Sequence, residues 1–394
     1  MDADFLKELF IRISNPRENE TKNDPCLRFN SSNSTQIPCN DNDFFLSFGE
    51  LNNSTEISHE GLVFFTYFTP IIFIVGIVGN ILSLMVFVTK NMRKLSASVY
   101  LAALSTADLL ALIFFVLIEW VKRGLREEFR SNIAEFLDVN GICQLTIFLS
   151  YASRFLSTWL VASFTLERYI GICHPLKRRD ICDINSSKKI VVILVLISIF
   201  ISSIRPWLNE VRHIGPDQTP WCLPKTDLVT VSFIYDCVFA VCITFLPFFV
   251  ITTLNILIIR TLIERSRRHR KCNFITEESI IRFEFTVILI TISICFIAFN
   301  SPYAVVWFKQ FHQTRTKTFS SGSKVDTLQN ILFFTKTAYF LNYCINFFLY
   351  SVTGAYFRKE LKALFTYRRK VNKSYQRCSV QNSHQSSSTP NSWM

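Results

Sequence analysis

The chain has 394 residues, of which 49% are hydrophobic and 14% aromatic, and its formal net charge is +12. A soluble protein of this length would be expected to divide into two domains with separate cores. Apolar runs instead fill nearly the whole chain between residues 60 and 355. Because the basic excess lies mostly in short loops, we interpret it as a contact with anionic membrane lipid and not as nucleic-acid binding.

Seven apolar runs are each long enough to cross a bilayer, since about 20 helical residues span the hydrocarbon core. Lipid leaves no water to satisfy backbone N–H and C=O groups, so each run is expected to be a helix. The runs are Val63–Val88, Val99–Val121, Cys143–Ile170, Ile190–Leu208, Leu228–Ile259, Phe285–Phe308 and Ile331–Val352. The predicted fold class is an all-α membrane protein, a seven-transmembrane helix bundle.

The runs divide the chain into three parts. Residues 1–60 form an acidic N-terminal tail, residues 61–367 the transmembrane domain, and residues 368–394 a serine-rich C-terminal tail that is expected to be disordered and phosphorylatable. No internal repeat of the kind many transporters show is found.

Basic residues in the loops predict the orientation of the chain, because positively charged loops stay in the cytoplasm. They follow the first, third, fifth and seventh runs, for example Arg93, Arg178, Arg268 and Arg358. The N-terminal tail is therefore predicted to be extracellular, in a multi-pass protein of the plasma membrane.

The N-terminal tail carries further signs of export. It contains two cysteines, Cys26 and Cys39, which are close enough to pair in an oxidising space. It also contains the glycosylation sequons Asn30, Asn33, Asn52 and Asn53. On the same side of the membrane, Cys143 opens the third run and Cys222 lies in the loop before the fifth. A disulfide between them would tie this loop to the third helix, stabilising it by roughly 4 kcal/mol.

Motifs in several runs resemble the rhodopsin-like (class A) family of G protein-coupled receptors. The third run ends in Glu167-Arg168-Tyr169, with Cys143 placed 25 residues before Arg168. The other matching features are Gly79-Asn80, Leu104-Ser105-Thr106-Ala107-Asp108, Pro247, Phe296 with Pro302, and Asn342, Asn346 and Tyr350. The resemblance covers about residues 60–367 and is to invertebrate neuropeptide receptors within the family. It implies a short amphipathic eighth helix from Phe357.

The resemblance also implies the partners on the cytoplasmic side. A heterotrimeric G protein would bind at the mouth of the bundle, and arrestin would bind the phosphorylated tail. The coupling residues implied in this way are Glu167, Arg168, Tyr169, Leu176 and Tyr350.

Five features depart from the family pattern, and one of them is the missing tryptophan in the middle of the fourth run. Asn300 stands where a tryptophan is usual, Phe347 replaces the seventh-run proline, and Asn255 replaces a fifth-run tyrosine. Arg282 stands where an acidic partner for Arg168 is often found. These changes affect the activation switch and leave the fold as expected.

Asp108 is predicted to lie in the middle of the membrane, where a charge costs about 2.5–3.5 kcal/mol and needs a partner or hydration. The resemblance implies a sodium site formed by Asp108, Ser157, Asn342 and Asn346. A water-filled hydrogen-bond network or a protonated Asp108 are the alternatives. No other cofactor is expected.

Charged and aromatic residues in the outer halves of the runs predict the ligand site. Intramembrane charges usually face the bundle interior, and both signs around one cavity suit a polar ligand of mixed charge. The candidate residues are Glu119, Ser150, Tyr151, Arg154, Asp236, Tyr303, Trp307, Lys336 and Tyr339. Glu119 or Asp236 would bind a cationic group, and Arg154 or Lys336 an acid or carbonyl. The alternative is that these charges pair with each other.

We therefore predict a receptor that binds an extracellular ligand, most simply a short neuropeptide, and activates a G protein. A chemosensory receptor for a small molecule is the first alternative, and a seven-helix ligand-gated channel the second. An enzyme is not expected, because the sequence has no metal-ligand cluster, P-loop or nucleophile elbow.

Overall fold

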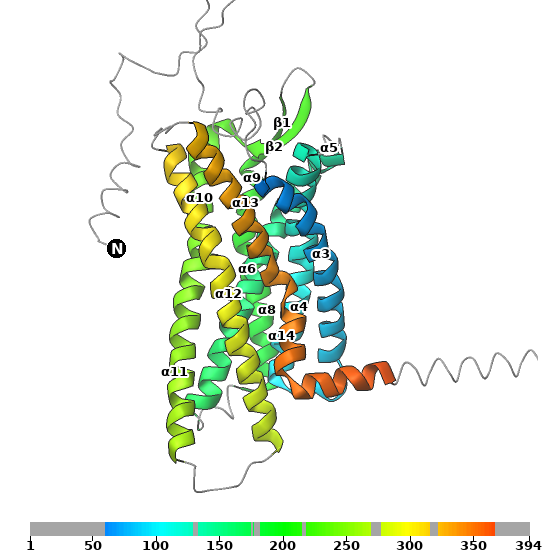
Figure 1. Cartoon of the computed structure of the whole chain (residues 1–394), viewed down its shortest axis with the longest axis vertical. Helices are drawn as coiled ribbons and strands as arrows, with labels where there is room; N and C mark the ends of the chain where they lie inside the picture. Colours follow the sequence, from blue (N-terminus) through cyan, green and yellow to red (C-terminus); the bar gives the residue numbers. More distant parts are fainter. Residues whose placement is uncertain are drawn as a thin grey trace, which may run out of the picture. The chain divides into compact units, whose positions relative to one another are not determined.

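The computed structural model describes residues 60–128, 133–174, 176, 182–214, 218–268, 277–315 and 322–366. These residues belong to one unit of the chain, Glu56–Met394. Within them, helices run side by side as a bundle (Figure 1). Several predicted features lie outside the described residues: Cys26, Cys39, the sequons Asn30, Asn33, Asn52 and Asn53, and the serine-rich tail.

Three of the predicted spans are continuous helices. They extend beyond the apolar runs at one or both ends, because a helix continues into the polar region on each side of the hydrocarbon core. These helices are α3 (Glu60–Phe87), α6 (Ile142–Cys173) and α12 (Glu277–Arg315).

The other spans are interrupted helices. The second is α4 (Ser96–Ala111), continued by the π-helical turns η2 (Leu112–Leu117) and η3 (Trp120–Glu128). The fourth is α8 (Ile184–Ser202) with α9 (Ile204–Trp207). The fifth comprises η4 (Thr226–Leu228), α10 (Val229–Ala240), η5 (Val241–Phe245) and α11 (Leu246–Arg268). The seventh is α13 (Gly322–Cys344) with α14 (Asn346–Thr353).

Six stretches among the described residues are long and apolar enough to cross a membrane. The seventh predicted run is the one divided at Ile345 between α13 and α14. The family's proline is absent here. The side chain of Asn346, the first residue of α14, is turned into the bundle, where it bonds to the Asp108 carboxylate. The chain therefore forms the predicted seven-transmembrane bundle.

Short elements connect the spans. They are η1 (Met92–Lys94), α5 (Ile133–Leu137) and an antiparallel hairpin of β1 (Asn209–Ile214) and β2 (Thr219–Pro224). The sequence predicted only a tethered loop where the hairpin lies. Residues 355–366 are helical and lie across the bundle axis at its base (Figure 1), in the place of the expected eighth helix.

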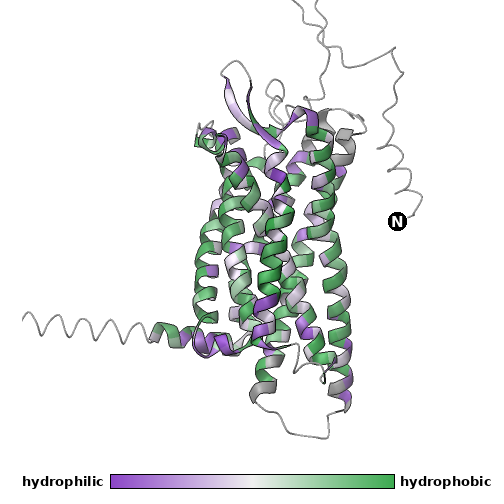
Figure 2. Cartoon of the chain, turned by 180° about the vertical axis from the view of Figure 1, so that it is seen from behind, coloured by the Kyte–Doolittle hydropathy of each residue, from purple (hydrophilic) through white to green (hydrophobic). Residues whose placement is uncertain are grey.

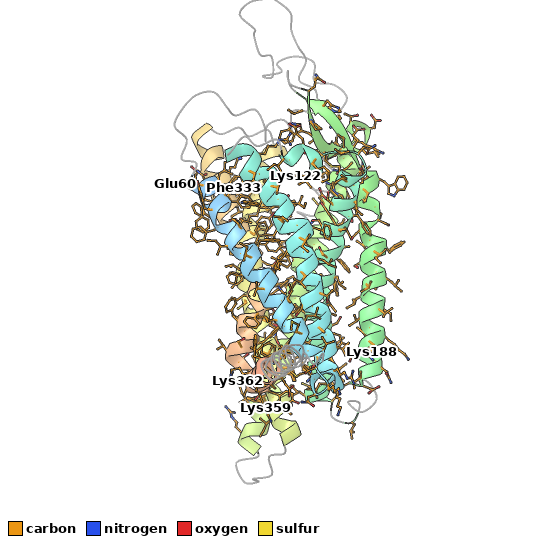
Figure 3. All side chains as sticks on the ribbon, turned by 90° about the vertical axis from the view of Figure 1, so that its right-hand side faces the viewer. Glu60, Lys122, Lys188, Phe333, Lys359 and Lys362 are labelled. Carbon is orange, nitrogen blue, oxygen red and sulfur yellow. A yellow bond between two sulfur atoms is a disulfide. The ribbon has the colours of Figure 1, made fainter. Side chains whose placement is uncertain are left out.

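Large apolar side chains cover the outside of the bundle. Ile74, Phe200 and Phe249 are 61%, 75% and 64% exposed, which only lipid makes favourable over so wide a surface. Figure 2 shows hydrophobic residues along most of the length of the helices. In Figure 3, Lys122 lies at one end of the bundle, while Lys188, Lys359 and Lys362 lie at the other. The chain is a multi-pass membrane protein.

Close packing of α3 against α13 depends on a glycine. A Cβ added at Gly61 would lie 2.5 Å from the backbone oxygen of Asn330. Small residues allow helix backbones to approach closely in membranes, so Gly61 fixes the distance between the first and seventh spans.

Replacing Gly61 with alanine is therefore expected to destabilise the purified protein, by about 1–3 kcal/mol as for other overpacked sites. Gly171→Ala in α6 is the matched control, because its Cβ would meet only Cys182 Sγ at 3.7 Å. Thermal unfolding in detergent measures both. Equal unfolding temperatures for the two variants would contradict this account of the α3–α13 contact.

Candidate functional site

The β-hairpin is fixed to the outer end of the third span by a disulfide. Cys143, at the start of α6, is bonded to Cys222 of β2, with a Cα–Cα distance of 6.0 Å. Val211 of β1 pairs with Cys222 in the strand register. The expected bridge is thus present, and it holds a two-stranded sheet beside the mouth of the bundle.

A buried carboxylate ties the same region together by charge. Asp138 is only 1% exposed and pairs with Lys122 at 2.5 Å and with Arg126 at 3.0 Å. Arg126 also donates to the Pro220 carbonyl at 3.1 Å and lies 3.6 Å above the Trp221 ring. This cluster of Asp138 with Lys122 and Arg126 was not predicted from the sequence. The four-residue spacing of Lys122 and Arg126 would have placed both on one helix face.

Glu119 and Lys336 form an ion pair with each other. Lys336 Nζ of α13 donates to Glu119 Oε2, and Arg123 Nε lies 3.1 Å from the same oxygen. The sequence predicted that Glu119 would bind a cationic group and Lys336 an acid or carbonyl. In the structure the two side chains pair with each other.

Asp236 is also paired internally. Its two carboxylate oxygens accept from Tyr151 at 2.7 Å and from Arg205 at 3.2 Å. Arg205 of α9 further donates to the Tyr151 hydroxyl at 3.1 Å and to Ser232. This cluster joins the third, fourth and fifth spans. Asp236 therefore has a cation within the protein.

Arg154 is different from the other charges. Its guanidinium lies 4.4 Å from the ring centroid of Phe115, 4.6 Å from that of Tyr151 and 5.2 Å from that of Phe239. Its Nε donates to the Ser150 carbonyl at 3.2 Å. Among the described residues, no carboxylate forms an ion pair with Arg154. The side chain is half-buried.

Tyrosines line the region below these charges. Tyr303 stacks on Tyr339 with 5.0 Å between ring centroids, and the hydroxyls of Tyr339 and Tyr343 are 2.7 Å apart. Of the remaining predicted residues, Ser150 is buried and reaches Arg154 through its carbonyl. Trp307 packs its ring edge-on against Phe308.

A second polar group lies deeper, around Asp108. Ser157 Oγ donates to one carboxylate oxygen at 2.6 Å, and Asn346 Nδ2 donates to the other at 2.7 Å. A cavity of about 20 Å³ adjoins this group and is lined by Ser157, Asn342 and Asn346 together with Asn300. Such a volume accommodates one water-sized particle. Asn80 instead donates to the carbonyls of Gly76 and Tyr343.

At the other end of α6 from Cys143, Arg168 pairs with its neighbour. Its Nη2 lies 2.9 Å from Glu167 Oε2 and donates to Ser96 Oγ at 3.2 Å. Tyr169 is within hydrogen-bond distance of His174, at 3.2 Å. The side chain of Arg282 is outside the described part of the chain.

The last two predicted coupling residues differ in exposure. Leu176 is 92% exposed, whereas Tyr350 is fully buried against the rings of Phe87 and Phe357. Leu176 is thus available to a partner, while Tyr350 is available only if the packing around it changes.

An unanticipated contact joins α12 to helix 355–366. Glu284 Oε2 accepts from the backbone N–H of Tyr356 at 2.9 Å. Gly354 precedes this helix and has no side chain to cap it. A Cβ there would lie 2.9 Å from the Tyr350 carbonyl and 3.1 Å from Ile288 Cδ1. The carboxylate of Glu284 therefore supplies the N-terminal cap from another helix.

The bundle, the Cys143–Cys222 tether and the Asp108 and Arg168 groups define the class of protein. Residues 79–350 match the family of seven-transmembrane receptors of the rhodopsin family. The chain belongs to this family, which is one of receptors and not of enzymes.

Several curated receptors are similar to the chain. The thyrotropin-releasing hormone receptor of Gallus gallus is 36% identical over 123 residues, which are 30% of this chain and 28% of that receptor. The FMRFamide receptor of Drosophila melanogaster is 24% identical over 310 residues, 76% of this chain and 53% of that receptor. The cysteinyl leukotriene receptor 2 of Mus musculus is 25% identical over 307 residues, 76% of this chain and 91% of that receptor. The chain thus spans less than a third of the first of these relatives.

The Glu119–Lys336 pair makes a testable contribution to stability. Removing one partner of a buried pair costs about 3–5 kcal/mol, and because Glu119 is 27% exposed we expect about 2 kcal/mol for Glu119→Gln. Adding Lys336→Gln to the same chain should recover part of this loss of stability, since it removes the buried positive charge that Glu119→Gln leaves without a partner.

The more exposed pair of Glu210 and Arg212, 3.4 Å apart, provides the control. Glu210→Gln is expected to cost less than about 1 kcal/mol. Thermal unfolding of Glu119→Gln, Lys336→Gln, the double variant, Glu210→Gln and the wild type tests the coupling. Strictly additive effects of Glu119→Gln and Lys336→Gln would show that the two side chains do not interact.

Proposed function

We propose that this protein is a plasma-membrane receptor that binds a short extracellular peptide in the outer part of its bundle and activates a heterotrimeric G protein. The observation that carries the proposal is the cluster of charged and aromatic side chains around Arg154 on α6, the helix whose outer end the Cys143–Cys222 bridge joins to the hairpin. Pockets with a few polar groups among aromatic walls are typical of ligand sites.

The relatives support the same conclusion. Receptors named for thyrotropin-releasing hormone and for FMRFamide are both similar to this chain. The similarity to a cysteinyl leukotriene receptor keeps a small-molecule ligand as the alternative. In this proposal the N-terminus is extracellular, because basic residues such as Arg93, Lys188 and Arg358 lie in the opposite loops and tail.

The G protein would bind at the cytoplasmic mouth. Exposed Leu176 offers an apolar contact, and the Glu167–Arg168 pair is a latch that the bound partner replaces. Helix 355–366 would rest on the inner leaflet, with Lys359 and Lys362 at anionic headgroups and Phe357 buried. Arrestin would bind the phosphorylated tail.

The group around Asp108 is suited to a sodium ion. It offers oxygens from Asp108, Ser157, Asn342 and Asn346 beside a cavity of the right size for one ion. A further buried oxygen, Asn80 Oδ1, has no hydrogen-bond partner among the described residues. A bound ion would supply positive charge next to the carboxylate and so oppose rearrangement of the second, third and seventh spans.

Sodium should therefore stabilise the purified wild type against thermal unfolding more than choline does at equal ionic strength. At ten times the dissociation constant the gain is about 1.4 kcal/mol. Asp108→Asn should remove the difference between the two salts, because it removes the charge while keeping the side-chain shape. A sodium effect of equal size in that variant would exclude this ion site.

The function itself is tested in cells expressing the chain. Calcium and cAMP responses to a library of neuropeptides with amidated and with free carboxylate C-termini, including thyrotropin-releasing hormone and FMRFamide, should include at least one response above that of untransfected cells. Arg154→Ala should weaken it by about tenfold or more, as loss of one charged contact does. Lys188→Ala, at the opposite end of the bundle (Figure 3), is the control.

Surface expression must be equal for all three proteins. Silence of the surface-expressed wild type across the library would contradict a peptide ligand and favour the small-molecule alternative.

A further inference from the structure

The outer chamber has more positive than negative charge. Glu119 is already paired with Lys336 and Arg123, and both oxygens of Asp236 are taken by Arg205 and Tyr151. Among the described residues of this chamber, four cations stand against two carboxylates: Arg123, Arg154, Arg205 and Lys336 against Glu119 and Asp236.

The excess charge is located at Arg154. This residue lies eleven positions after Cys143 on α6, which places it about 16 Å below the disulfide. Its guanidinium interacts electrostatically with both Lys336 and Asp236. The charges in this part of the bundle therefore influence one another. Two of the three neighbouring cations already have a carboxylate, and the third shares one. Arg154 has ring faces, the Ser150 carbonyl and the neutral hydroxyl of Tyr339, and no carboxylate among the described residues.

Ring faces attract a guanidinium but do not neutralise it. A guanidinium also has five N–H donors, arranged as a fork that matches a carboxylate. The bond from Nε to Ser150 and the contact with the Tyr339 hydroxyl leave N–H donors of the terminal nitrogens for other acceptors. The rings of Phe115, Tyr151 and Phe239 would at the same time flank any apolar group that enters beside the anion.

We infer that Arg154 binds an anionic group of the ligand, and that this group is a carboxylate next to an aromatic or other flat apolar moiety. The inference rests on the proposed function and narrows it. A ligand whose deepest group is cationic is disfavoured, because both carboxylates in the chamber have partners and Arg154 would repel it. Lys336 is not the anion anchor, since Glu119 holds it.

Three small probes test the ligand class without a known natural ligand. N-acetyl-phenylalanine carries a ring and a carboxylate, N-acetyl-phenylalanine amide is its neutral analogue, and phenylethylamine is the cation. Thermal unfolding of the purified full-length receptor is measured against the concentration of each. Sodium acetate supplies the anion without the ring.

We expect the carboxylate probe to bind at least tenfold more tightly than the amide, which corresponds to about 1.4 kcal/mol, and phenylethylamine and acetate to give no shift. Arg154→Gln should abolish the preference for carboxylate over amide. Arg154→Lys should retain part of it, because the charge remains while the fork is lost. Lys188→Gln should leave it unchanged.

Equal shifts from the carboxylate and the amide on the wild type, or no shift from the carboxylate, would overturn the inference even if the variants failed to fold. If Lys336→Gln lost the preference for carboxylate and Arg154→Gln kept it, Lys336 would be the residue that binds the anion. That result would also overturn the inference. The readout is binding alone. A receptor that signals to a peptide yet shows no carboxylate preference would refute this inference and leave the proposed function standing.

Discussion

The carboxylate of Asp108 is the constraint on which much of the bundle depends. A charge or a strongly polar group in the middle of a membrane must have donors around it, and here they come from Ser157 of the third span and Asn346 of the seventh. These two bonds hold three spans at one depth. Asn346, one of the two donors, is also the first residue of α14, directly after the interruption at Ile345.

Two tyrosines precede this break. Tyr339 and Tyr343 lie in the last two turns of α13, and their hydroxyls are hydrogen-bonded to each other. Both residues line the cavity beside Asn342 and Asn346. Tyr339 also stacks on Tyr303 of the sixth span. The same tyrosines therefore form the floor of the outer chamber and the roof of the inner cavity. A ligand that moves Tyr339 would change both at once.

The sequence predicted the parts of the fold that depend on local composition. Runs of about 20 apolar residues gave the spans, and the positions of Cys143 and Cys222 predicted their bridge. The π-helical turns η2 and η5 were not foreseen. They insert a residue into the helical repeat without any glycine in their own sequences, and only η5 has a proline nearby, at Pro247.

The pairing of the charges could not be predicted either, because it depends on how the helices are rotated relative to one another. The sequence shows that Glu119, Arg154, Asp236 and Lys336 are intramembrane charges, but their partners depend on rotations of the helices. The turns η2 and η3 lie on either side of Glu119 and help to set the direction in which it faces Lys336. The cluster around Asp138 was missed because its members lie in segments between the runs, where hydropathy carries no signal.

The cap that Glu284 provides to Tyr356 links two helices thermodynamically. A capping bond is lost once its atoms separate by more than a few tenths of an ångström beyond hydrogen-bond distance. Any displacement of the N-terminal end of α12 therefore leaves the first turn of helix 355–366 with an unsatisfied donor. By reciprocity, whatever stabilises the start of that helix also favours one position of α12. In the proposed orientation, the lipid composition of the inner leaflet would then be a variable in the conformational equilibrium of the whole bundle.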